Sequence, residues 1–295
     1  MPNSITSLGT SAFYGCTSLQ EVTLPNSITT INSQSFYGCS RLKQINIPIL
    51  VSTLYDSTFY NCSSLEEIVL PWGLKQINSS VFYGCTSLHT LTMGEGVTSL
   101  GSSAFSGCAS LSNINFSPRL TSIGGSCFIN CSSLMEASLP EGVSDLGASA
   151  FKGCTALQKM VVPKNTITIG ASCFEGCSSL TEIVIQKNVN TIGDAFLKGA
   201  YALEKLEVDQ DNAHYYSENN VLYTYDKKTL IVAAKADVSE RLELPDGVEI
   251  ITSYAFEKAK FGEVIPKEGL KTIQSYAFLL AELTKFEFVS TIATI

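Results

Sequence analysis

The chain has 295 residues, of which 45% are hydrophobic and 16% are charged, and its formal net charge is −8. This hydrophobic content is enough for a packed interior and excludes global disorder. The acidic balance and the absence of a basic stripe exclude the usual features of nucleic-acid binding and argue against docking on an anionic membrane. No apolar run reaches the ~18 residues of a membrane span, and Met1-Pro2-Asn3 does not begin like a signal peptide.

Cysteine recurs every 23 residues along the first two thirds of the chain, at Cys16, Cys39, Cys62, Cys85, Cys108, Cys131, Cys154 and Cys177. A short fixed period is typical of a solenoid, in which each repeat is one supersecondary unit stacked on its neighbours. We therefore expect about eleven rungs around one continuous core. With strands ~4.8 Å apart, the stack should be roughly 50–60 Å long.

Each rung is predicted to contain one short strand. In the second rung, Leu42 follows the cysteine by three residues, and Ile45 and Ile47 bracket one polar residue. This alternation is typical of a strand with one face inward. Proline cannot donate to a strand ladder, so Pro48 and its equivalents should end the strand.

The part of each rung that leads to the cysteine is predicted to be a helical turn or a short 3₁₀ segment. It begins after a further apolar column that includes Leu8 and Ile31, and Phe stands three residues before each cysteine, where both side chains would share one face. Only Gly or Asn directly precedes the cysteine, as at Gly38 and Asn61. These residues tolerate left-handed backbone, which predicts a positive-φ turn there.

The whole unit, Leu42-x-x-Ile45-x-Ile47-Pro48 leading to Phe59-Tyr60-Asn61-Cys62, resembles the BspA-like subclass of leucine-rich repeats. The resemblance covers nearly the whole chain. It implies an α/β fold: a right-handed solenoid with one short parallel strand and one helical or 3₁₀ turn per 23-residue rung. Members of that family are mostly surface proteins of host-associated bacteria and some mucosal protozoa, which implies adhesion or binding.

The period breaks after the eighth cysteine. Ala200 takes the ninth cysteine position, and residues 209–241 do not fit a rung. Two apolar runs, 221–225 and 230–232, flank Asp226-Lys227-Lys228 and predict a β-hairpin. Three parts are therefore expected: a solenoid over 1–208, a hairpin insertion over 209–241, and C-terminal repeats over 242–295. Both chain ends lack a polar capping unit, so a fragment of a longer protein is expected, with an end-to-end oligomer or unusual caps as alternatives.

Neither a disulfide framework nor a metal site is predicted. Stacked equivalent cysteines would keep their Cβ atoms ~5 Å apart, beyond disulfide range, so free structural thiols are expected. The additional Cys127 and Cys173 lie two rungs apart, ~10 Å, too far to share one zinc ion. The motif that starts at Asp209 lacks the glutamate of a calcium loop.

No catalytic or cofactor-binding site is predicted either. Neither His89 nor His214 has a nearby catalytic partner in the sequence, and no nucleotide-binding or hydrolase motif occurs. The chain is therefore not expected to be an enzyme, and no cofactor is expected.

Two surfaces are candidates for protein binding. The first is the strand face, formed by outward residues that should tile one side of the sheet: Glu21, Thr23, Gln44, Asn46, Glu67, Val69, Thr90, Thr92, Asn113 and Asn115. The second is a tyrosine stripe formed by Tyr14, Tyr37, Tyr60 and Tyr83. Stacked tyrosines are either rigid contact anchors or an edge-packing ladder with no partner. Trp72, which follows a proline at a turn, would add to either surface.

The functional expectation is a noncatalytic protein-binding scaffold. The family resemblance implies a cell-surface adhesin or host-protein binder, located extracellularly or at the cell surface, with extracellular-matrix or host-surface proteins as partners. Neither nucleic-acid binding nor membrane insertion of this segment is expected. The alternative is a structural spacer or self-assembling surface element whose ends or tyrosine stripe pack against copies of itself.

Overall fold

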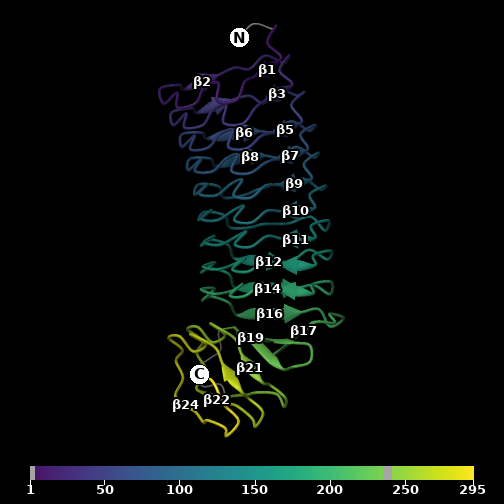
Figure 1. The fold of residues 1–295 in the computed structure, drawn as a ribbon, viewed down its shortest axis with the longest axis vertical. Coiled ribbons are helices and arrows are strands. Elements are labelled where there is room, and N and C mark those ends of the chain that lie inside the picture. Colours follow the sequence, from purple (N-terminus) through teal and green to yellow (C-terminus); the bar gives the residue numbers. More distant parts are fainter. Residues whose placement is uncertain (1–3, 235–240) are drawn as a thin grey trace.

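The computed structural model describes residues 4–234 and 241–295, which form a parallel β-solenoid of about twelve turns (Figure 1). The regular part has a 23-residue rung, as its strand register shows: Ser7 pairs with Thr30 and Leu8 with Ile31. Within these residues, no helix is both long and apolar enough to cross a membrane. The predicted stacking of successive 23-residue repeats is confirmed.

The longest sheet forms where the sequence predicted no strand. It has nine parallel strands, one per rung, and each contributes a single inward side chain such as Ile31 or Leu54. With only two residues per strand, the inward–outward alternation is too short to be recognised in the sequence. The strands are β1 (Ser7–Leu8), β3 (Thr30–Ile31), β5 (Thr53–Leu54), β7 (Gln76–Ile77), β9 (Ser99–Leu100), β10 (Ser122–Ile123), β11 (Asp145–Leu146), β13 (Thr168–Ile169) and β15 (Thr191–Ile192).

The predicted strand is the second strand of the rung. It forms short parallel sheets with the same 23-residue register, and rungs between them are joined by single bridges such as Thr92 to Asn115. Its outward residues therefore lie side by side along one face, as predicted. The strands are β2 (Glu21–Val22), β4 (Gln44–Ile45), β6 (Glu67–Val69), β8 (Thr90–Thr92), β12 (Lys159–Val161), β14 (Glu182–Ile185) and β16 (Lys205–Val208).

The predicted helical turn is wrong: residues 4–234 and 241–295 contain no helix, so the fold is all-β and not α/β. In the first rung, the Tyr14 N–H donates to Ser11 O at 3.0 Å within the turn, but the Phe13 N–H donates to Ser35 O of the next rung at 2.7 Å. A helix would keep every such bond within its own segment. Left-handed backbone at Ser11 (φ 57°) and at the predicted position Gly15 (φ 69°) also prevents helix continuation.

The core is built from the repeated columns. The Phe side chains from Phe13 to Phe174 form a continuous stack, with ring centroids 5.2 Å apart at one end and 5.7 Å at the other. All ten cysteines are free, as predicted, and all but Cys16 are buried. The buried thiols also donate across rungs, for example from Cys62 Sγ to Phe36 O at 3.1 Å. Burial raises the pKa of Cys131 to about 12, so this thiol stays neutral.

The predicted hairpin is present. β18 (Val221–Thr224) and β19 (Thr229–Ala233) are antiparallel, and β17 (Tyr215–Glu218), which the sequence did not predict, pairs with the other edge of β18. Residues 235–240 of the predicted insertion lie outside the described residues. The chain then returns to parallel pairing through β20 (Arg241–Glu243), β21 (Ile250–Ile251), β22 (Glu263–Ile265), β23 (Thr272–Ile273) and β24 (Lys285–Phe286).

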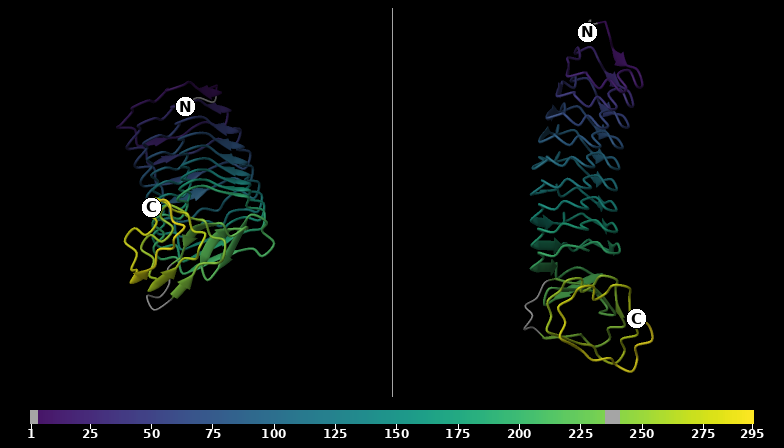
Figure 2. Two further views of the ribbon diagram at one scale, coloured as in Figure 1. Left: turned by 60° about the horizontal axis from the view of Figure 1, so that its bottom comes forward. Right: turned by 90° about the vertical axis from the view of Figure 1, so that its left-hand side faces the viewer.

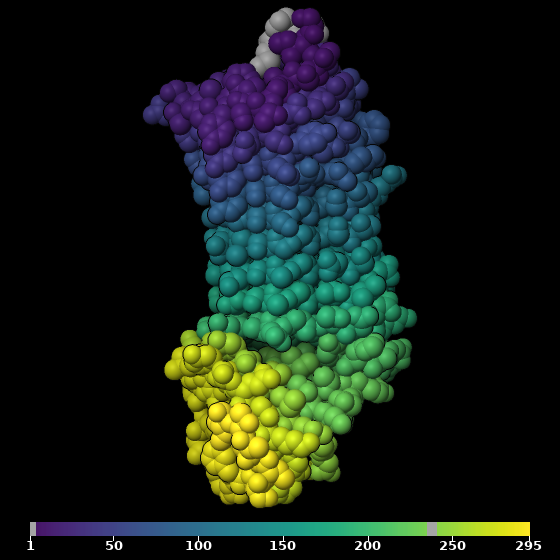
Figure 3. Space-filling view, viewed as in Figure 1, coloured from purple at the N-terminus to yellow at the C-terminus, as the bar shows by residue number. Residues whose placement is uncertain are grey.

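The hairpin divides the molecule into two cores, so the single continuous core expected from the repeat is wrong. In the right-hand view of Figure 2, the regular rungs are seen edge-on, whereas the C-terminal rungs are seen as open loops. The molecular surface is hollowed where these two parts meet (Figure 3). Side chains of β17 and of the turn that joins it to β18 satisfy the last regular strand, β16: the Val208 N–H donates to Ser217 Oγ at 2.9 Å and the Leu206 N–H to Asn220 Oδ1 at 3.2 Å. These bonds take the place of backbone pairing with a further rung, and so they protect the edge of β16.

Candidate protein-binding site

A groove of about 770 Å³ lies on the strand face across β2, β4 and β6. It contains the predicted candidates of the first three rungs together with the tryptophan: Glu21, Thr23, Gln44, Asn46, Glu67, Val69 and Trp72. The remaining strand-face candidates, Thr90, Thr92, Asn113 and Asn115, are exposed on the rungs that follow. The structure therefore brings Trp72 to the strand face and not to the tyrosine stripe.

One side of the groove is apolar and open to solvent. Ile49, Val69 and Trp72 have 54%, 64% and 69% of their surface exposed. Gathered exposed apolar side chains mark interaction sites more often than single ones do. Tryptophan is also the residue type most enriched among energetically dominant interface residues. The groove thus has the composition of a contact surface.

Ile49 is a groove residue that the sequence analysis missed. It directly follows a proline, in the same column as Trp72, and both side chains are exposed. A signal was available, because this column is polar, charged or proline in the other rungs of the regular part: Asn26, Glu95, Pro118, Glu141, Lys164 and Lys187. Two consecutive apolar residues in an otherwise polar column therefore mark the groove.

The charge on the strand face changes along the solenoid. Glu21 and Glu67 flank Gln44 in the outward column, and within the described part of the chain neither carboxylate has an ion-pair partner. Further along the same column, Glu182 pairs with Lys159 at 2.8 Å and with Lys205 at 3.1 Å. These lysine contacts lower the pKa of Glu182. The end of the strand face that carries the groove is therefore acidic, whereas the charge of Glu182 at the other end is neutralised by lysines.

Asn46 has a structural task within the groove. Its Oδ1 accepts a hydrogen bond from the Leu24 N–H at 2.7 Å, and its Nδ2 donates to Leu24 O at 2.8 Å. In a neighbouring pair of rungs, the equivalent Leu70 N–H donates to the backbone, at Thr92 O. The Asn46 amide therefore replaces backbone pairing between two rungs, and its polar atoms are already engaged.

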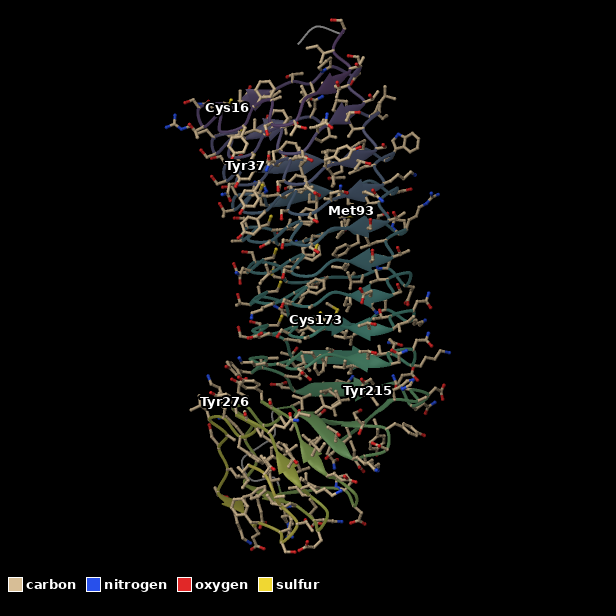
Figure 4. All side chains as sticks on the ribbon, in the orientation of Figure 1. Cys16, Tyr37, Met93, Cys173, Tyr215 and Tyr276 are labelled. Atoms are coloured by element: carbon tan, nitrogen blue, oxygen red, sulfur yellow. The ribbon has the colours of Figure 1, made fainter. Side chains whose placement is uncertain are left out.

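The predicted tyrosine stripe is a stacked ladder. Tyr14, Tyr37, Tyr60 and Tyr83 have ring centroids 4.6, 4.6 and 4.5 Å apart, with nearly parallel planes. Burial, followed by the effect of the neighbouring tyrosines, raises the pKa of Tyr60. In Figure 4 Tyr37 lies at the left-hand edge of the solenoid, on the same side as Cys16. None of the four tyrosines lines the groove, so the two predicted surfaces are separate.

The described residues hold no candidate metal site. Among them, no group of three or more His, Cys, Asp or Glu side chains is arranged to hold a metal ion. Burial raises the pKa of both Cys127 and Cys131, which disfavours the thiolate form that binds metals or attacks substrates.

The fold and the open strand face define a solenoid repeat protein of the leucine-rich-repeat class. A family model described as the BspA type leucine rich repeat region matches residues 1–112, 98–219 and 235–295. The chain belongs to this BspA-type leucine-rich-repeat family, as its repeat pattern indicated.

Two solved structures share the fold. A leucine-rich repeat protein from Bacteroides ovatus is 22% identical, with a TM-score of 0.63 over 99% of this chain and 87% of that protein. A leucine rich cell surface protein from Faecalibacterium prausnitzii is 24% identical, with a TM-score of 0.64 over 88% of this chain and 66% of that protein. No curated protein matches the chain.

Proposed function

We propose that this chain is a noncatalytic protein-binding scaffold at a cell surface, and that it binds with its strand face. The observation that carries the proposal is the groove across β2, β4 and β6, where exposed Trp72 and Val69 lie with the carboxylates of Glu21 and Glu67. A rigid sheet presents these side chains at low entropic cost, because ordering is already complete before a partner binds.

The proposed cell-surface location rests on a relative. A structural relative from Faecalibacterium prausnitzii is described as a cell surface protein. A bacterial surface scaffold without chemistry of its own is suited to adhesion, and we propose extracellular-matrix or host-surface proteins as partners. The chain would act by shape and side-chain complementarity alone.

The test is capture of surface-labelled epithelial proteins and purified matrix proteins by immobilised chain. Val69→Arg with Thr92→Arg blocks the strand face without touching the core, because both side chains are exposed. Tyr60→Ser with Tyr83→Ser disrupts the tyrosine ladder. We expect the first variant to lose capture and the second to retain it, and the reverse result would move the binding surface to the ladder.

Sedimentation velocity over a wide range of protein concentration distinguishes the binding scaffold from the alternative of a self-assembling surface element. A strict monomer that captures partners supports the binding scaffold. Concentration-dependent assembly that the ladder variant abolishes would instead support a self-assembling surface element.

A further inference from the structure

We infer that the groove across β2, β4 and β6 takes a cationic, partly apolar, extended segment of a partner protein. This inference rests on the proposed function and adds the chemistry of the partner. It is carried by two features of one groove: two carboxylates in a lining that includes no lysine or arginine among the described residues, and exposed apolar side chains that include an indole.

The first feature calls for positive charge. Glu21 and Glu67 stand on strands two rungs apart, about 10 Å, with the Gln44 amide between them. The nearest ion pair on these rungs, Lys43 with Glu66 at 3.5 Å, is formed by residues outside the groove lining and cancels itself. A lysine or arginine side chain placed over Gln44 would meet both carboxylates and could also donate a hydrogen bond to the Gln44 amide oxygen.

The second feature calls for an apolar neighbour of that cation. Trp72 is 69% exposed at the edge of the groove, and Val69 and Ile49 continue the same apolar surface. An indole face binds arginine and lysine through its quadrupole as well as aliphatic groups through burial. An alternation of cationic and aliphatic residues therefore matches both parts of the groove, and an acidic segment matches neither.

The size of the groove limits the segment. Its lining spans three rungs, about 10 Å between the first and third strands. An extended chain advances about 3.3–3.6 Å per residue, so three or four residues fill this span.

A second groove on the same face provides an internal comparison. It has a volume of about 540 Å³ and is lined by Glu136, Lys159 and Glu182, from the same outward column. Here Lys159 already pairs with Glu182 at 2.8 Å, and the column carries its own cation. Of these two grooves, only the second therefore has a lysine in its own lining.

The experiment uses the full chain and three fluorescein-labelled decapeptides: one alternates lysine with leucine, and in the others glutamate or serine replaces lysine. We expect the lysine peptide to bind at low salt and the other two to bind at least tenfold more weakly. Two exposed charge contacts together change the dissociation constant about tenfold, so Glu21→Gln with Glu67→Gln should weaken binding by that factor. Trp72→Ala should weaken it about thirtyfold, as for a dominant interface residue.

Glu136→Gln is the matched control, because it removes a carboxylate from the same column outside this groove and should leave binding unchanged. All substituted side chains are on the surface, and far-ultraviolet circular dichroism checks their folding. Equal binding of the lysine and glutamate peptides, or unchanged binding after the double glutamine substitution, would overturn the inference. If the lysine peptide fails while Val69→Arg with Thr92→Arg still abolishes capture of host proteins, the proposed function stands and only the cationic partner is wrong.

Discussion

Alkaline pH should destabilise this protein far more steeply than it does an ordinary domain, because of its buried thiols. Burial is the largest cause of the raised pKa at each of eight buried cysteines, here called the buried spine: Cys62, Cys85, Cys108, Cys127, Cys131, Cys154, Cys173 and Cys177. In the unfolded chain a thiol ionises near pH 8.5. The folded protein binds these protons more tightly, so their stabilisation is complete below about pH 8.5 and is lost as pH rises towards the folded values.

The magnitude follows from the number of thiols. Each one contributes a loss of about 1.4 kcal/mol per pH unit above its unfolded pKa. Cys131, whose folded pKa is about 12, therefore loses about 2 kcal/mol of stabilisation by about pH 10. Eight such groups lose about 11 kcal/mol per pH unit, which is comparable with the whole stability of a typical domain. The regular rungs should unfold between about pH 9 and about pH 10.

Urea denaturation under reducing conditions, followed by circular dichroism, measures the effect. Cys131→Ala removes one titrating thiol, so its destabilisation relative to the original chain should shrink by about 2 kcal/mol between about pH 7 and about pH 10. Leu134→Ala, which removes a fully buried side chain without a titrating group, is the control, and its cost should not change with pH. A midpoint that stays constant through about pH 10, or a Cys131→Ala cost that does not depend on pH, would refute the reasoning.

Three further results are expected. Phe82→Ala, which opens a gap in the fully buried stack, should lower the free energy of unfolding by about 3–5 kcal/mol, whereas Phe13→Ala, at a partly buried ring, should cost less in the same urea titration. A thiol-specific chromogenic reagent should modify only Cys16 in the folded chain and all ten cysteines after denaturation; protection of Cys16 or reaction of several thiols in the folded chain would contradict the buried spine. Glu257→Ala removes the carboxylate that accepts hydrogen bonds from the Gly199 N–H at 3.0 Å and Tyr201 OH at 3.2 Å, so amide exchange at Gly199 should accelerate about tenfold; unchanged exchange would show that this contact does not hold the two cores together.

The columns of the repeat were predictable because each column has one physical task. The Phe, Cys and Leu columns are buried in every regular rung after the first, and the Gly or Asn before each of the eight repeating cysteines has positive φ, as at Gly38 (70°) and Asn61 (55°). The strand face was predictable for the same reason, since stacking in register keeps equivalent outward residues adjacent.

The helical turn was mispredicted because spacing alone cannot distinguish where backbone hydrogen bonds go. Phe36 and Cys39 are three residues apart, as on a helix face, but alternate N–H groups in this segment bond to the next rung. The second left-handed position, for example Gln34 (φ 57°), is occupied by residues that carry no clear left-handed preference. Neither feature could be seen without the neighbouring rung in place.

The sequence by itself determined the rung length, the inward columns, the free thiols and the residues that tile the strand face, because these depend only on a period that repeats along one chain. The tertiary structure decided that, in the described residues, each regular rung has a strand and no helix before its cysteine, that the hairpin splits the core in two, and that Ile49 and Trp72 complete a groove with Glu21 and Glu67. These features arise from contacts between rungs, where backbone groups and side chains 22 or 23 residues apart satisfy one another, and such pairings carry no local pattern.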